Sequence, residues 1–221
     1  MWHDYSMTTP FFIDIWSDVV CPFCYLGTRQ LSEALALFEH RDQVVTRPHA
    51  FELDPHAPIN YDVSLPELLA QKYGMSVEHA RAANERLEAQ ARTLGMTWSL
   101  ANARPTNTFD AHRLIALATS QDLGEPMVQR LFHAYFSQGL LLSDREVLNG
   151  LASEVGVAGA EGLWNDDRFA VDVRSDELRA QELGVSGVPS MLIDNRVMVV
   201  GAQGTEKILE GLERAWQRRA N

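Results

Sequence analysis

The sequence predicts an α/β protein in which an all-helical segment interrupts a smaller α/β unit. Three observations support this prediction: a strand–helix–strand pattern near the start, helix signals without a convincing strand from residue 64 to about residue 176, and a hairpin followed by a helix at the end. We expect residues 11–61 and 177–221 to form one domain together, and residues 62–176 to form the insertion.

The composition restricts the classes of partner. The 221 residues are 46% apolar, and 19 basic residues stand against 30 acidic ones, which gives a net charge of −11. A net-acidic chain without a basic run offers little to phosphates, so we expect no nucleic-acid partner. The apolar stretches are too short to span a membrane, and residues 1–6 lack the basic-then-apolar pattern of a secretion signal. We therefore expect a cytoplasmic protein with no membrane partner.

The first α/β unit begins with residues 11–16, whose aromatic and β-branched side chains are typical of a strand. A helix pattern follows from Pro22 to about Phe38, and residues 43–53 form a second strand candidate. Pro48 favours an edge position for that strand, because proline has no N–H to donate to a neighbour. This order and spacing predict a right-handed unit with parallel strands.

The middle segment carries helix signals only. Capping-box patterns at residues 64–67 and 143–146 predict two helix starts, and a long helix from Val77 ends before Gly95. Pro126 opens a further helix with an apolar stripe, which we assign to the core of the insertion. The stripe consists of Met127, Leu131, Phe132, Tyr135 and Phe136.

The last part of the chain returns to mixed structure. A helix through residues 176–183 stops at Gly184. Residues 190–193 and 196–200 flank Asp194 and Asn195, which predicts a hairpin, and a final helix begins at Thr205. The two ends of the chain thus supply a strand–helix–strand unit and a hairpin–helix unit.

Cys21 and Cys24 are the only cysteines. A disulfide scaffold and a four-cysteine zinc site are therefore excluded, and the scattered histidines predict no metal site. In a reducing compartment, a C-x-x-C pair is typical of transient redox chemistry. The alternative is a pair of buried cysteines that act as small apolar residues.

The position of the pair favours the chemical interpretation. Cys21 falls at about the N-cap of a helix that follows a strand, where free N–H groups and the helix dipole favour a thiolate and lower the pKa of the thiol. Cys24 lies one turn further on, on the buried face, and burial raises its pKa. We therefore assign attack on a substrate disulfide to Cys21 and resolution of the mixed disulfide to Cys24.

Three neighbouring features complete the predicted site. Phe23 offers no charge or side-chain hydrogen bond, which predicts a weaker oxidant than a histidine in its place. Asp18 is a candidate proton relay to Cys24, and the alternative is a solvated or capping carboxylate. A cis Val188–Pro189 bond would turn the backbone of Val188 towards an extended substrate, whereas the alternative is an ordinary trans proline at a strand start. The residues that we expect to bind the substrate are Val188, Pro189, Pro22 and Phe23.

Five short stretches follow one another along almost the whole chain: 17–27 (SDVVCPFCYLG), 51–55 (FELDP), 107–114 (NTFDAHRL), 187–190 (GVPS) and 201–203 (GAQ). Together they resemble the DsbA-like family of the thioredoxin-fold superfamily, and within it the FrnE-type branch. The resemblance implies a thioredoxin fold interrupted by a helical insertion.

The same resemblance implies a dithiol–disulfide oxidoreductase or isomerase in which Cys21 and Cys24 are redox-active and Pro189 is cis. It implies no tightly bound cofactor and no metal, and it allows glutathione as a redox partner. The expected partners are thiols and disulfides of proteins or of low molecular weight. The expected assembly is a monomer or a homodimer.

Two other functions stay open. Glutathione-dependent isomerases of the 2-hydroxychromene-2-carboxylate type and kappa-class transferases share the fold. Resemblance to them implies serine at the position of Cys21, so the cysteine favours direct redox chemistry. The other alternative is a redox-inert or metal-binding interaction protein that docks through its helical segment. We place Asn107 and His112 in a segment that can face the site, and we interpret His112 as a packed or capping residue.

Overall fold

A four-stranded mixed sheet forms the centre of the α/β part of the protein. The computed structural model describes residues 9–219. β1 (Phe11–Ser17) pairs in parallel with β2 (Val44–Ala50) and antiparallel with β3 (Ser190–Ile193), and β3 pairs antiparallel with β4 (Val197–Val200). The strand order β2-β1-β3-β4 places β2, with its proline, at an edge, and the mixed sheet confirms the predicted α/β class.

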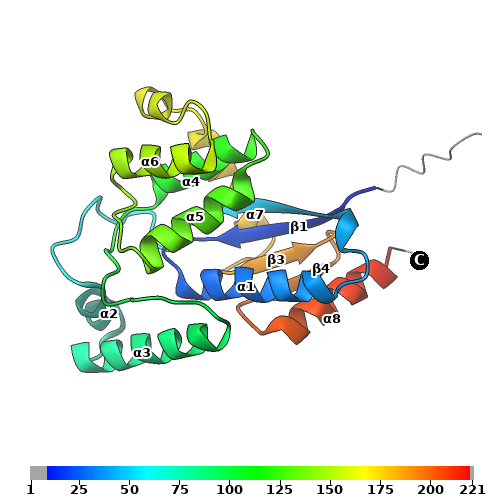
Figure 1. Cartoon of the computed structure of the whole chain (residues 1–221), viewed down its shortest axis with the longest axis horizontal. Helices are drawn as coiled ribbons and strands as arrows, with labels where there is room; N and C mark the ends of the chain where they lie inside the picture. Colours follow the sequence, from blue (N-terminus) through cyan, green and yellow to red (C-terminus); the bar gives the residue numbers. More distant parts are fainter. Residues whose placement is uncertain (1–8, 220–221) are drawn as a thin grey trace, which may run out of the picture.

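Helices cover both faces of the sheet (Figure 1). α1 (Pro22–Leu37) and α8 (Thr205–Gln217) lie side by side on one face, and α7 (Ala170–Glu182) packs on the other. The first interface is closed by buried apolar side chains that include Phe11, Ile13, Leu31, Ile208 and Leu212. The second is smaller and contains Trp16, Ala180, Val185 and Leu192.

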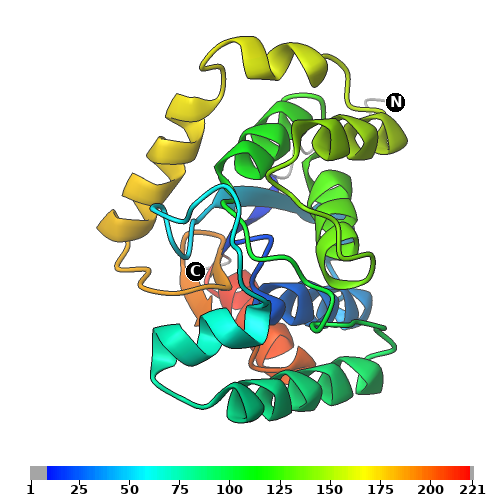
Figure 2. The same cartoon turned by 90° about the vertical axis from the view of Figure 1, so that its left-hand side faces the viewer.

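Between β2 and α7 the described chain holds five α-helices, which form the insertion. They are α2 (Leu65–Tyr73), α3 (Val77–Thr93), α4 (Phe109–Thr119), α5 (Gly124–Phe136) and α6 (Arg145–Val155). Short 3-10 helices lie at Arg41–Gln43 and Glu161–Asn165. Figures 1 and 2 show α4, α5 and α6 on one side of the start of α1, and α2 and α3 on the other. The insertion therefore surrounds the end of the sheet at which α1 begins.

The apolar stripe of α5 is buried in the core of the insertion, as predicted. Its side chains, from Met127 to Phe136, are almost completely shielded from solvent. The same cluster of buried residues contains Cys21, Cys24 and Leu26 from the start of α1. The cysteine pair and the insertion thus belong to one packing unit.

Two helix starts differ from the sequence prediction. α5 begins at Gly124 instead of Pro126, because a proline fits anywhere in the first helical turn, where its missing N–H has no intrahelical partner to lose. The capping box predicted at the start of α2 is confirmed. The one predicted at Ser143 is wrong, since the side chain of Asp144 accepts the N–H groups of the first turn of α6.

Two further boundaries are set by contacts distant in the sequence. β2 ends at Ala50, before the predicted end at residue 53, because the N–H of Leu53 donates to the carboxylate of Asp18 at 2.8 Å instead of to a strand. α7 begins at Ala170, before the predicted start at residue 176. The helix therefore runs across the expected boundary between the insertion and the second part of the α/β domain, and that division of the chain stays a prediction.

No helix within residues 9–219 has both the length and the apolar character that crossing a membrane requires.

A network of charged side chains joins β1, β2 and α7. The imidazole of His49 lies between two carboxylates, with Nε2 at 2.7 Å from Asp14 and Nδ1 at 2.5 Å from Asp176. Asp14 is fully buried and also accepts from Arg47 at 2.7 Å, and Asp176 accepts the backbone N–H of Ala50 at 2.9 Å. The network anchors α7 to the sheet.

The hydrogen bonds of this network shift the pKa of two of its members. Burial alone would lower the pKa of His49, but the hydrogen bonds that its ring donates to Asp14 and Asp176 outweigh burial and raise that pKa above its ordinary value of 6.5. Burial alone would raise the pKa of Asp14, but the bonds from His49 and Arg47 lower it below 3.8. The histidine therefore contributes stability that is complete below pH 6.5 and is lost as pH rises through its raised pKa. The carboxylate contributes stability that is complete above pH 3.8 and is lost as pH falls through its lowered pKa.

We predict that His49→Gln lowers the free energy of unfolding by about 3 kcal/mol at pH values between those two ordinary pKa values, because it removes one partner of a buried ion pair. The loss should shrink as pH rises from 6.5 through the raised pKa of His49, at which the folded protein gives up this proton. Denaturant unfolding of both proteins across this range measures the difference, with His79→Gln, an exposed histidine on α3, as the control. A difference that does not change with pH would contradict the prediction.

Candidate active site

The two cysteines lie at the start of α1. Cys21 is the N-cap, with an extended backbone (φ −88°, ψ 114°), and Pro22 occupies the first helical turn. The carbonyl oxygen of Cys21 accepts from the N–H groups of Cys24 and Tyr25 at 3.0 and 3.3 Å, and its own N–H donates to the carbonyl oxygen of Asp18 at 3.0 Å. Both cysteines are free thiols. The helix start therefore holds the two sulfurs in the predicted relation, one turn apart.

The environment lowers the pKa of the Cys21 thiol. The largest contribution is a hydrogen bond from the thiol of Cys24, which burial opposes; the backbone N–H groups of Cys24 and Phe23 add to the lowering, and the negative charge of Asp18 opposes it. The direction agrees with the prediction. Its main cause is the partner thiol, and the backbone N–H groups expected from the sequence contribute less.

The pKa of Cys24 is shifted in the opposite direction. Burial raises its pKa well above the ordinary value, and the neighbouring Cys21 raises it further. A backbone hydrogen bond from Asp18 opposes this rise, and the charge of Asp18 adds to it. The pair thus consists of one thiol with a lowered pKa and one with a raised pKa.

Access to Cys21 is narrower than expected for a nucleophile. Only 4% of the residue is exposed, and Cys24 is 0% exposed. The cover comes from the insertion, whose core includes both cysteines, and from Val188, which packs against that core. Phe23, between the two cysteines, is 47% exposed and marks the open side of the site.

The loop before β3 lies against Cys21. Its Val188–Pro189 peptide bond is cis, and the Sγ of Cys21 lies 3.8 Å from the carbonyl oxygen of Val188, close enough for a thiol to donate a hydrogen bond. Pro189 itself is buried, and Val188 is half-buried. The role of these residues in substrate binding stays a prediction, as does that of half-buried Pro22.

Gly27 lets α1 and this loop approach each other. A Cβ atom at this position would lie 3.0 Å from Cγ of Pro189 and 3.6 Å from Cε of Met191. The first distance is shorter than an ordinary contact, so a methyl group would require a shift of the proline ring, whereas the second is an ordinary van der Waals contact. The loop position therefore depends on a glycine one turn after Cys24.

Asp18 is buried, so the solvated carboxylate considered above is wrong. Its side chain is 1% exposed; Oδ2 accepts the N–H of Leu53 at 2.8 Å, and Oδ1 accepts that of Val20 at 3.4 Å. Nε2 of His112 lies 3.6 Å from Oδ1. The relay role of Asp18 stays a prediction.

His112 faces the site, as its segment was expected to do. It is packed as expected, with 2% exposed, but its side chain caps no helix end within residues 9–219; Asn107, the residue before the N-cap Thr108, accepts the N–H of Phe109 at 2.9 Å through Oδ1. Glu52 was missed from the sequence: its side chain is fully buried and pairs with Arg174. A charged residue between two apolar ones resembles any surface strand position, so no signal in the sequence singles out Glu52.

Tyr25, the residue after Cys24, packs the start of α1 against the insertion. The ring of Tyr25 stacks on those of Trp98, Phe132 and Phe136 at centroid distances of 4.9–5.7 Å. Both halves of the insertion thus contact the helix start, since Trp98 precedes α4 and the two phenylalanines lie on α5.

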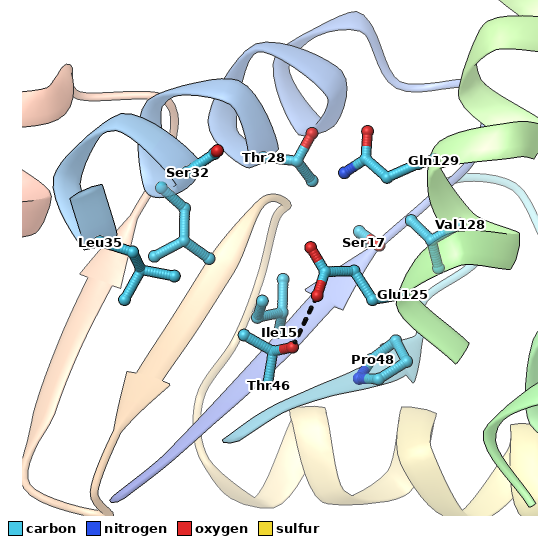
Figure 3. A pocket seen from close by; sticks show the side chains of 11 residues that line it. Ile15, Ser17, Thr28, Ser32, Leu35, Thr46, Pro48, Glu125, Val128 and Gln129 are labelled. Atoms are coloured by element: carbon cyan, nitrogen blue, oxygen red, sulfur yellow. Dashed lines mark hydrogen bonds between the residues drawn. The ribbon is translucent and has the colours of Figure 1, made fainter. Parts of the chain in front are cut away.

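A separate cavity lies between α1, the sheet and α5 (Figure 3). Its lining includes Ile15, Leu35 and Val128, and Glu125 of α5 points to β2, where its carboxylate accepts from Thr46 at 3.2 Å. Neither Cys21 nor Cys24 is among the described residues that line this cavity. No group of three or more histidine, cysteine or acidic side chains within residues 9–219 is arranged to hold a metal ion.

Comparison with known proteins identifies the family. Residues 12–213 match the family described as DSBA-like thioredoxin domain. The chain belongs to this family. Its sheet and helical insertion are thus a thioredoxin-like fold, and Cys21 and Cys24 form the C-x-x-C pair of a DSBA-like chain.

Three known proteins are similar to this DSBA-like chain. A probable DsbA oxidoreductase from Streptomyces coelicolor is 35% identical, with a TM-score of 0.90 over 95% of this chain and 91% of its own. The cytosolic disulfide reductase DsbM from Pseudomonas aeruginosa is 18% identical, with a TM-score of 0.65 over 95% of this chain and 100% of its own, and shares the fold. The uncharacterized protein YwbO of Bacillus subtilis (strain 168) is 28% identical over 88% of this chain and 92% of its own.

We predict that a small alkylating reagent such as iodoacetamide labels Cys21 at least about tenfold faster than Cys24, because a pKa difference of one unit already changes the thiolate fraction about tenfold. A bulky maleimide should react with Cys21 more slowly than a small maleimide does, because only 4% of this residue is exposed. Mass spectrometry of timed samples measures both rates. Equal labelling of the two cysteines in the folded protein would contradict the prediction.

We predict that Gly27→Ala lowers the free energy of unfolding by about 1–3 kcal/mol, because the added methyl group meets the ring of Pro189. Gly150→Ala is the matched control: it lies within α6 with no atom near its added Cβ, so it should stabilise the protein by about 0.5–1 kcal/mol. Chemical denaturation separates the two outcomes. Equal stabilisation by both substitutions would show that the loop does not need the glycine.

Proposed function

We propose that this DSBA-like protein is a thiol–disulfide oxidoreductase or isomerase of the FrnE type, with Cys21 as the nucleophile and Cys24 as the resolving thiol. One observation carries the proposal: two thiols at the start of one helix have pKa values shifted in opposite directions. This is the asymmetry that two-step disulfide exchange requires, because one sulfur must attack first and the other must wait. The likeness to the Streptomyces coelicolor DsbA oxidoreductase supports the reaction class.

The reaction follows from the two thiols. The thiolate of Cys21 attacks one sulfur of a substrate disulfide; a new S–S bond forms, the substrate S–S bond breaks, and the second substrate sulfur leaves and takes up a proton. Cys24 then loses its proton and attacks Cys21, which releases the first substrate sulfur as a thiol. The substrate is reduced by two electrons and the cysteine pair is oxidised to a disulfide; the reverse sequence oxidises a dithiol.

The surroundings of the pair support an extended peptide or a small disulfide as substrate. Phe23 and Leu53 are 47% and 44% exposed, and the backbone of Leu53 is tied to Asp18 beside the helix start. Apolar side chains at an open site favour unfolded chain segments over charged surfaces. In this proposal Pro22 and Phe23 contact the substrate on one side, and Val188 and Pro189 contact it on the other.

The same proposal covers partners and location. We place the protein in the cytoplasm, as a monomer or homodimer that exchanges with thiols and disulfides of proteins or of low molecular weight. Glutathione serves as a redox partner and not as a tightly bound cofactor.

We predict that Cys21→Ser abolishes reduction of insulin disulfides in the presence of a thiol reductant, because no thiolate is left to start the exchange. Cys24→Ser should retain the first attack and accumulate mixed disulfides with the substrate, which non-reducing gel electrophoresis and mass spectrometry detect. The reductant without protein is the control.

Insulin reduction that continues unchanged in Cys21→Ser would refute the proposal. Tight binding of glutathione by the native protein, together with no exchange of any protein disulfide, would instead favour a glutathione-dependent isomerase or transferase.

A further inference from the structure

Three large apolar side chains are exposed at the end of the molecule at which α1 begins. Phe23 of α1 is 47% exposed, and Leu53 and Ile59, between β2 and α2, are 44% and 67% exposed. Figures 1 and 2 show the chain between β2 and α2 at the same end of the molecule as the start of α1. The two exchange steps involve no side chain of residues 53–61, which we call the rim loop.

Both ends of the rim loop lie beside the cysteine pair. The N–H of Leu53 donates to the Asp18 carboxylate at 2.8 Å, and the carbonyl oxygen of Asp18 accepts the N–H of Cys21 at 3.0 Å. At the other end, burial raises the pKa of Tyr135, and the negative charges of Asp18 and of ionised Tyr61 raise it further. Tyr61 and Asp18 thus lie within electrostatic reach of one side chain, so the rim loop leaves and returns to the same part of the site.

Hydrogen bonds hold the rim loop in one shape. Within it, the N–H of Ala57 donates to the carbonyl oxygen of Asp54 at 3.0 Å. From the segment before α4, the amide of Asn107 donates to the carbonyl oxygen of Ala57 at 3.1 Å, and the hydroxyl of Thr106 donates to that of Ile59 at 3.0 Å. A loop with these anchors has little conformational freedom to lose when a partner binds, so it presents Ile59 at a low entropic cost.

The apolar side chains of Leu53 and Ile59 are not what anchors the loop. The hydrogen bonds at these two positions are made by a backbone N–H and a backbone carbonyl oxygen. A polar side chain at either position would keep both bonds and would remove apolar surface from water. One exposed leucine needs no explanation, but two large apolar side chains on one anchored loop beside a reactive thiol indicate a binding surface.

The reaction at Cys21 determines what covers this surface. Only 4% of Cys21 is exposed, so a disulfide on a folded surface cannot approach it without rearrangement. An extended chain segment is thin enough to bring its sulfur to Cys21, and the residues on either side of the substrate cysteine then lie over the rim of the site. A small disulfide has no such residues to place there.

We propose that Leu53 and Ile59 form an apolar subsite for side chains next to the cysteine of a peptide substrate, so that the protein prefers disulfides of unfolded segments with apolar flanks. The inference rests on the proposed function and concerns which substrate is taken, since no bond forms or breaks in the subsite. Binding covers the two side chains and releases water from them, which favours the encounter through the hydrophobic effect.

Three disulfides that release thiopyridone when Cys21 attacks them test the subsite. Two are short peptides that carry one cysteine as a thiopyridyl disulfide and differ only in the flanking residues, which are leucines in one peptide and serines in the other. The third is dithiodipyridine, which has no flanking residues. Stopped-flow absorbance with the disulfide in excess gives a second-order rate constant for each one.

The variants are Leu53→Ser, Ile59→Ser and their combination, which keep the backbone bonds of the rim loop. Leu37→Ser is the matched control. Leu37 is 67% exposed, like Ile59, and it ends α1, about 22 Å along the helix from Pro22.

We expect the native protein to react about tenfold or more faster with the leucine peptide than with the serine peptide. In the double variant this preference should fall below about threefold, because only the reaction with the leucine peptide becomes slower. Each single variant should lie between these limits. All variants should react with dithiodipyridine at the native rate, and Leu37→Ser should keep the full preference.

Equal rates for the two peptides in the native protein would overturn the subsite, and so would a leucine preference that the double variant retains. A dithiodipyridine rate that falls in parallel with the peptide rate would mean that the rim loop acts on the cysteines instead of on the substrate, which also overturns it. If the native protein reacts with none of the three disulfides, the proposed function itself fails.

Discussion

The carboxyl group of Asp18 lies buried where the end of β1, the segment after β2 and the first turn of α4 meet. The two carboxylate oxygens accept the N–H groups of Leu53 and Val20, and the ring of His112 faces the carboxylate. The backbone carbonyl oxygen of Asp18 accepts the N–H of Cys21. A buried carboxylate is costly without such partners, so the three segments cannot move apart independently. The start of α1, and with it both thiols, is positioned by this arrangement.

The asymmetry between the thiols arises from the same helix start. At the N-cap, Cys21 receives hydrogen bonds from backbone N–H groups and from its partner, whereas Cys24, one turn later, points into the core that the insertion completes. The insertion therefore forms part of the surroundings of both thiols. It shields Cys24 from water and covers most of Cys21, and it supplies the aromatic rings that stack on Tyr25.

Much of the fold could be read from local patterns, because strands, helix starts and turns depend on residues close in sequence. The C-x-x-C pair after an aromatic-rich strand, Pro22 in the first helical turn and the Asp194–Asn195 hairpin are features of this kind. The errors fell at the ends of elements, one of them set by a distant partner and one by a neighbouring side chain. β2 stops where Leu53 bonds to Asp18, and α6 takes Asp144 as its cap because that side chain, and not the preceding serine, reaches the free N–H groups.

The sequence by itself determined the α/β class, the interrupted order of its parts and the C-x-x-C pair, since each rests on short-range spacing. Only the tertiary structure decided how closely Cys21 is covered, and that His112 lies beside Asp18 and interacts with Glu52. These depend on contacts between segments 35 to 167 residues apart, as in the bonds from Leu53 to Asp18 and from Cys21 to Val188. Long-range contacts leave no periodic trace in a single sequence, because burial and partner choice arise only when the chain has folded.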